Sequence, residues 1–94
     1  MRKEFILKGN NVRETKENLI LELYRLRKKA KMSQILLSEK SNISRSTIVR
    51  AESLDLVMNL ENLVKCAEAL GCELSLVLKT KDEKKEPVKT LKKQ

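Results

Sequence analysis

Apolar residues in the first part of the chain recur at intervals of three and four, the spacing that lines one face of an α-helix. The residues that share this face are Leu19, Leu23, Leu26 and Ala30. Asn11 and Glu14 precede this run at the spacing of a capping box. We therefore expect an N-terminal arm over residues 1–10 and a long first helix near residues 11–30.

Three shorter helices are predicted by residue types that commonly cap helix N-termini. These N-cap residues are Ser33, Ser44 and Asn59. An apolar stripe follows each of them, with Leu37, Ile48 and Leu63 at its centre. Between the first two short helices, Asn42 accepts a left-handed backbone at modest cost, which allows a sharp turn. Gly71 is expected to end the last helix as its C′ residue.

After Gly71 the period of the pattern changes to two. The apolar face would hold Leu74, Leu76 and Leu78, and the other face would hold Ser75 and Val77. This alternation predicts a β-strand near residues 72–79. A lone strand leaves its backbone groups unpaired. Two partners remain open: the strand-like run "EFILK" at residues 4–8, or the same strand of a second copy in a symmetric homodimer.

Composition favours an all-α domain. The chain has one Phe and one Tyr, so its core must be aliphatic, which suits packed helices. No apolar run approaches the roughly 18–20 residues of a membrane span, and the N-terminus does not resemble a signal peptide. We therefore expect a cytoplasmic protein that does not associate with membranes. Cys66 and Cys72 form no CxxC pair and the chain has no His, so neither a metal site nor another cofactor is expected.

Charge is unevenly distributed along the chain. The net charge of +8 comes mainly from residues 13–31 and from the end of the chain, whereas residues 53–78 are acidic. Residues 80–94 are rich in Lys and poor in apolar side chains, so we expect a basic, disordered tail. A chain with this much positive charge is expected to have an anionic partner, a charged tail, or both.

The stretch "SQILLSEKSNISRSTIVRAE" at residues 33–52 predicts two short helices joined by a tight turn, which is a helix-turn-helix unit. On the second helix, Arg45, Ser46, Val49 and Arg50 lie on the side opposite Ile48. Arg reads guanine through two hydrogen bonds, and Ser bonds to several base edges. The alternative is an ordinary solvated helix face. The position of two arginines on a short capped helix of a basic chain favours double-stranded DNA as the partner.

This stretch resembles the Cro/CI-type, or XRE-family, helix-turn-helix. The matching features are Gln34, "SRSTI" at residues 44–48, Arg50 and Glu52. Residues 60–74, "LENLVKCAEALGCEL", are similar to the family's fourth helix, so the resemblance covers about residues 19–74. It implies a λ-repressor-like, all-α domain of four to five helices over residues 11–79, here with one C-terminal β-strand.

The resemblance also implies roles for particular residues. The candidate DNA-binding residues are Gln34, Ser44, Arg45, Ser46, Thr47, Val49 and Arg50. Of these, Gln34 would contact a phosphate, whereas Arg45, Ser46 and Arg50 would approach bases. Arg27 stands where the family often places an arginine that pairs with Glu52. Such a buried pair is expected to fix positions rather than to add stability, because desolvation offsets the attraction.

Several positions depart from the family pattern. Ile35 replaces a polar residue, Leu54 replaces a frequent Gly, and the loop "SLDLVM" at residues 53–58 carries an acid where lysines would hold a phosphate. The apolar residues here are Ile35, Leu54, Leu56, Val57 and Met58. They could pack internally or form a docking surface for another protein.

A strand directly after "EALG" is similar to the HipB-type antitoxins, in which one strand per subunit pairs across the dimer axis. The corresponding residues here are Leu74, Ser75, Leu76, Val77 and Leu78. We therefore expect a dimeric repressor that binds an operator, with the antitoxin of a toxin–antitoxin pair as one version. The alternatives are a stand-alone regulator of phage or host type and a protein-interaction module. The chain has no His, no Gly-rich phosphate loop and no ligand cluster, which argues against an enzyme.

Overall fold

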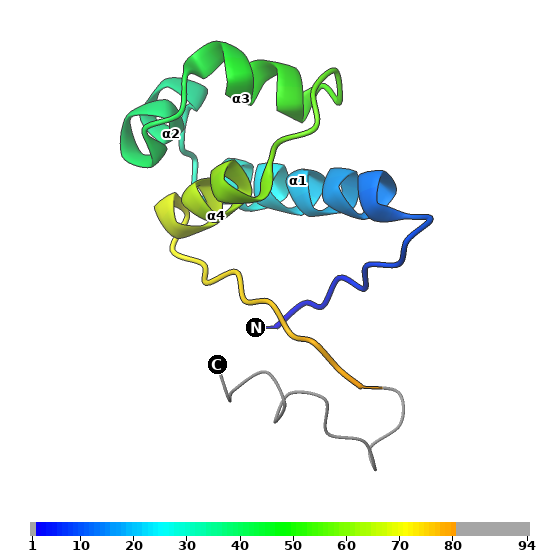
Figure 1. Cartoon of the computed structure of the whole chain (residues 1–94). Helices are drawn as coiled ribbons and strands as arrows, with labels where there is room; N and C mark the ends of the chain where they lie inside the picture. Colours follow the sequence, from blue (N-terminus) through cyan, green and yellow to red (C-terminus); the bar gives the residue numbers. More distant parts are fainter. Residues whose placement is uncertain (1, 81–94) are drawn as a thin grey trace, which may run out of the picture.

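A computed structural model of the chain describes residues 2–80, and four helices form within them. The helices are α1 (Val12–Lys29), α2 (Gln34–Ser41), α3 (Arg45–Glu52) and α4 (Leu60–Ala69). Figure 1 shows α2 and α3 on one side of the layer formed by α1 and α4. The all-helical architecture expected from the sequence is therefore confirmed for the described residues. Residues 81–94, most of the tail predicted at 80–94, lie outside them.

The core is aliphatic and draws on all four helices. Its buried members are Ile20, Leu23, Leu37, Ile43, Ile48, Ala51, Met58, Leu63, Cys66 and Ala67. Ile43 and Met58 come from the connections between helices, so the turns are fastened to the same core as the helices. Because α2 and α3 have eight residues each, they are too short to be stable in isolation and depend on this packing.

Three of the predicted N-caps are confirmed. The Ser33 hydroxyl accepts a hydrogen bond from the Leu36 N–H at 3.0 Å, and the Ser44 hydroxyl accepts one from the Thr47 N–H at 3.2 Å. The side-chain oxygen of Asn59 accepts a hydrogen bond from the Asn62 N–H at 2.8 Å. Each bond satisfies one backbone donor that a helix start leaves without an intrahelical partner.

The capping box predicted at Asn11 and Glu14 is wrong. The Asn11 side chain makes no capping hydrogen bond to α1. Its oxygen instead accepts a hydrogen bond from the Lys8 N–H at 2.7 Å, and its amide donates to the Ile6 carbonyl at 3.4 Å. Thr15 donates to the same carbonyl at 3.4 Å. The N-terminal arm therefore competes with the helix for the Asn11 side chain.

Helices α1, α3 and α4 end in the same backbone motif, with a left-handed residue directly after the cap. These left-handed residues are Lys31 (φ 57°), Leu54 (φ 66°) and Gly71 (φ 80°). The next residue in each case donates back into the helix, from Met32 to Arg27 (3.1 Å), Asp55 to Arg50 (2.8 Å) and Cys72 to Ala67 (2.8 Å). This is the Schellman arrangement, which favours Gly because a Cβ atom strains the left-handed backbone.

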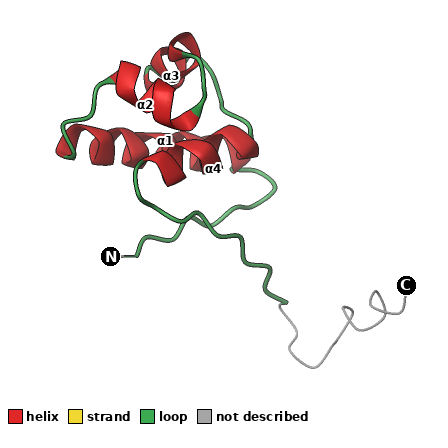
Figure 2. Ribbon diagram, turned by 90° about the vertical axis from the view of Figure 1, so that its left-hand side faces the viewer, coloured by secondary structure: helices red, strands yellow, loops and turns green. Residues whose placement is uncertain are grey.

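The strand predicted near residues 72–79 does not form within the described chain. Residues 72–80 are extended without strand pairing, and no backbone hydrogen bond joins residues 73–78 to residues 4–8 among the described residues. A single extended segment without a neighbour has no ladder to join. Figures 1 and 2 show both extended segments on the side of the helices opposite α2 and α3.

Only the first part of the apolar face of residues 72–80 packs on the helices. Leu74 packs against the core, whereas Leu76 and Leu78 are 76% and 91% exposed. None of the described helices has the length and apolar character needed to span a bilayer.

Candidate nucleic-acid interface

Helix α3 has one buried face and one open face. Ile48 and Ala51 are buried in the core. On the other side, Arg45, Ser46, Val49 and Arg50 are exposed and line one shallow, open depression. Residues four apart lie on the same side of a helix, which groups Arg45 with Val49 and Ser46 with Arg50. Burial of Ile48 and Ala51 therefore turns these four residues outward.

At the start of α3, Ser44 and Thr47 are engaged with each other and with the backbone. Their hydroxyl oxygens lie 2.8 Å apart, and the Ser44 hydroxyl also accepts the Thr47 N–H. The structure therefore gives these two predicted DNA-binding residues a capping role, which holds the first turn of α3 ready beside Arg45.

Arg27 and Glu52 form a buried, two-pronged ion pair. The Arg27 Nε and Nη2 atoms each donate to one Glu52 carboxylate oxygen at 2.8 Å. Both side chains are less than a tenth exposed, at 7% and 8%. Arg27 Nη1 also donates to the Met32 carbonyl at 2.7 Å. This network joins the end of α1 and the turn after it to the end of α3.

Gln34 also binds Glu52, and the sequence did not predict this contact. Its amide nitrogen donates to Glu52 Oε1 at 2.9 Å, so the amide is turned toward the carboxylate. The Glu52 carboxylate therefore receives hydrogen bonds from α1 and from the first residue of α2. The only sequence signal for this contact was the expected partnership of Arg27 and Glu52.

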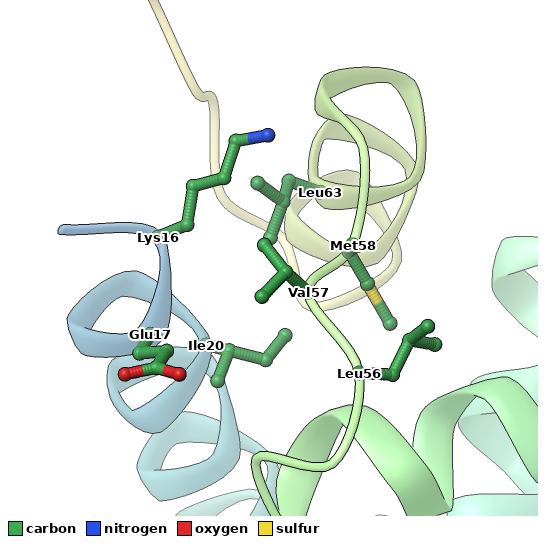
Figure 3. Close-up of a pocket in the computed structure, with 7 residues that line it drawn as sticks. All are labelled: Lys16, Glu17, Ile20, Leu56, Val57, Met58 and Leu63. Atoms are coloured by element: carbon green, nitrogen blue, oxygen red, sulfur yellow. The ribbon is translucent and has the colours of Figure 1, made fainter. Parts of the chain in front are cut away.

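The loop between α3 and α4 packs mainly inward. Met58 is buried, Leu54 packs against the core, and Leu56 and Val57 are half-buried. Figure 3 shows Val57 directed toward Ile20 and Leu63 across a crevice of about 10 Å³ between α1, this loop and α4. A space of that size holds about one water molecule and no ligand.

Ile35 differs from the loop residues. Its side chain is 53% exposed on α2 and is accompanied by Leu36, which is 38% exposed. The apolar departures from the family pattern therefore divide into internal packing in the loop and an exposed pair on α2.

The two cysteines are free thiols in different surroundings. Cys66 is buried and Cys72 is half-buried. Burial raises the pKa of the Cys66 thiol to about 11, and the nearby negative charge of Glu52 adds to this effect. Among residues 2–80, no three potential metal ligands cluster together.

Comparison with known families agrees with this geometry. The family model described as helix-turn-helix matches residues 23–77, which is more than half of the chain. The protein belongs to this XRE-type helix-turn-helix family and is a DNA-binding transcription regulator. Neither the curated proteins nor the solved structures gave a significant match. The narrower similarity to HipB-type antitoxins stays a prediction.

Proposed function

We propose that this protein represses transcription by binding an operator of two half-sites as a homodimer. The observation that carries the proposal is the open face of α3, where Arg45, Ser46, Val49 and Arg50 lie together opposite a buried face. A short helix whose inner side is held by packing presents its outer side to a DNA major groove.

Within this face, Arg45 and Arg50 would read bases. A guanidinium donates two parallel hydrogen bonds to the O6 and N7 atoms of guanine, which no other base pair accepts in the same pattern. Ser46 and Val49 are small enough to let the backbone of α3 approach the groove, and Val49 offers an apolar contact for a thymine methyl group. The Arg27–Glu52 pair would hold α3 at the angle this requires.

Residues 73–78 are the proposed dimer element. Leu76, Val77 and Leu78 are largely exposed, and their extended backbone has unpaired donors and acceptors that the same segment of a second copy would satisfy. One helix-turn-helix reads only a few base pairs, so two copies about 34–36 Å apart on one face of the duplex are needed for an operator.

The base-reading residues are tested by alanine substitution in the full-length protein. The probe is a duplex selected from a random-sequence pool by the wild-type protein, with a scrambled version as reference. We expect Arg45→Ala or Arg50→Ala to weaken binding to the selected duplex by about 1–3 kcal/mol and to weaken binding to the scrambled duplex less. The control is Arg13→Ala, which removes an exposed arginine from the first turn of α1. Equal losses on both duplexes would contradict base reading.

The dimer element is tested by placing proline at Ser75 or at Leu76. Proline lacks the backbone donor and clashes with strand pairing, so the variant whose N–H belongs to the ladder should become monomeric. Sedimentation should show the monomer, circular dichroism should show intact helices, and operator affinity should fall by orders of magnitude. Two variants that both remain dimeric with full affinity would exclude this segment as the interface.

A second candidate is that the repressor is also an antitoxin. The exposed Ile35 and Leu36 on α2 favour it, because they offer an apolar surface to another protein. The test is co-expression with the product of the neighbouring reading frame. Stable co-purification that Ile35→Ser abolishes would support the antitoxin role, whereas no interaction would favour a stand-alone regulator.

A further inference from the structure

The last turn of α1 and the connection to α2 carry three exposed lysines, Lys28, Lys29 and Lys31, which we call the lysine turn. The ion pairs formed within residues 2–80 involve other cations, since Arg25 pairs with Glu22 and Arg27 pairs with Glu52. None of the three ammonium groups forms an ion pair with an acidic side chain of the described residues, so this corner of the domain carries exposed positive charge.

Helix stability explains part of this charge but not all of it. Lys28 and Lys29 lie in the last turn of α1, where cations interact favourably with the helix dipole. Lys28 also lies with its Nζ atom 6.0 Å from the centre of the Tyr24 ring. Lys31 lies beyond the helix and has neither explanation.

Lys31 occupies a position where glycine would be more stable. Its φ of 57° is left-handed, a conformation that any residue with a Cβ atom adopts only at an energetic cost. Lys31 is exposed, so packing does not compensate for this strain. A lysine at this position is therefore best explained by what its charge does outside the domain.

Hydrogen bonds to Glu52 connect the lysine turn to the end of α3. Arg27 donates both to the carbonyl of Met32, in the turn, and to Glu52, at the end of α3. Gln34, the first residue of α2, donates to the same carboxylate. The lysine stems are thus anchored on a backbone whose position relative to α3 is fixed by buried hydrogen bonds.

The turn on the other side of α3 has the opposite character. Residues 53–59 contain no lysine or arginine and include Asp55. The cations of the described terminal segments, residues 2–8 and 72–80, do not compensate, because these segments lie on the side of the helices away from α3 (Figures 1 and 2).

We propose that Lys28, Lys29 and Lys31 contact DNA phosphates on the α1–α2 side of α3, and that the α3–α4 turn makes no cationic contact with the backbone. The inference rests on the proposed DNA-binding function and adds which side of the domain grips the duplex. Ammonium groups on flexible stems suit phosphate contacts, which fix register and orientation but carry no sequence information.

The test compares two double variants of the full-length protein that lose the same charge. Lys29→Ala/Lys31→Gly removes two lysines from the turn, and Arg2→Ala/Lys8→Ala removes two cations from the arm. The probe is a synthetic duplex of arbitrary sequence, and the readout is the slope of log K against log salt. Each lost phosphate contact reduces the magnitude of the slope by about 0.9, so we expect a reduction of up to about 1.8 in the turn variant and little in the arm variant. Adding Lys28→Ala should remove about 0.9 more.

Three results would overturn the proposal: an unchanged slope in the turn variant, equal changes in both variants, or a loss of binding that tracks a loss of folding in urea. Lys31→Gly alone guards against the last, because it removes the charge while relieving the backbone. A failure of the proposed function would look different, since the wild-type protein would then select no preferred sequence, or Arg45→Ala would leave that preference intact, whatever the salt slope.

Discussion

The two turns that flank the helix-turn-helix unit share a backbone motif and differ in chemistry. In the α1–α2 turn the left-handed residue is Lys31, which is exposed and has lysines beside it. In the α3–α4 turn it is Leu54, which packs against the core and is followed by Asp55. The same strained geometry thus directs charge outward in one turn and an apolar side chain inward in the other.

The comparison shows that backbone strain has to be interpreted together with burial. Removing the half-buried Leu54 side chain from water contributes roughly 1–2 kcal/mol, which is similar to the strain it carries. Lys31 has no such compensation within its own domain. Similar left-handed φ angles, 57° at Lys31 and 66° at Leu54, therefore accompany packing in one turn and, in our proposal, a DNA contact in the other.

The largest effect is expected where the two turns are joined, at the Arg27–Glu52 pair. Arg27→Ala would leave the Glu52 carboxylate buried without its main partner, so we expect the free energy of unfolding to fall by about 3–5 kcal/mol in urea titrations. Replacing both residues by apolar ones of similar volume, as in Arg27→Met/Glu52→Leu, should cost much less because no unpaired charge remains. A double variant as unstable as the single one would contradict this account.

The second prediction separates the two left-handed residues. Lys31→Gly should raise the free energy of unfolding by about 0.5–1 kcal/mol, because it relieves strain without losing a buried contact. Leu54→Gly relieves the same strain but loses apolar burial, so its net effect should be near zero or destabilising by about 1 kcal/mol. Equal stabilisation by both substitutions, measured by thermal unfolding, would show that burial does not distinguish the turns.

The third prediction concerns a cation introduced into the α3–α4 turn, which contains Asp55 and no lysine or arginine. Asp55→Lys places a cation in the α3–α4 turn and should increase the magnitude of the salt slope by up to about 0.9 on any duplex. Asp55→Asn removes only the repulsion and serves as the matched control. Identical slopes for the wild-type protein and for Asp55→Lys would mean that this turn lies away from the phosphates.

The smallest effect concerns Cys66, which lies in the core near the Glu52 end of the network. Since burial raises the pKa of this thiol to about 11, alkylation at pH 8 should be much slower at Cys66 than at the half-buried Cys72. The contribution of this raised pKa to the free energy of unfolding is fully present below pH 9.0, the ordinary pKa of the thiol. It is lost as the pH rises toward 11. Mass spectrometry of the labelled chain provides the measurement, and Arg27→Ala should accelerate labelling of Cys66.

Some features followed from the sequence because they depend on residues a few positions apart. Ser33, Ser44 and Asn59 each cap a backbone N–H three residues later. Asn42, with φ of 60°, forms the sharp turn between α2 and α3. The outward face of α3 followed from the same short-range logic, because the helical period places Ser46 and Arg50 opposite Ile48 once that residue is buried.

Other features were decided only by the tertiary structure. The Gln34 amide lies on a carboxylate 18 residues away, and the N-terminal arm draws the Asn11 side chain away from α1. The alternation at residues 72–79 predicted a strand, yet the segment is extended and unpaired in the single chain, because pairing requires a neighbour that periodicity does not supply. Local hydrogen bonds are encoded by spacing, whereas contacts between distant residues depend on which helices pack together and how strongly each polar group is then desolvated.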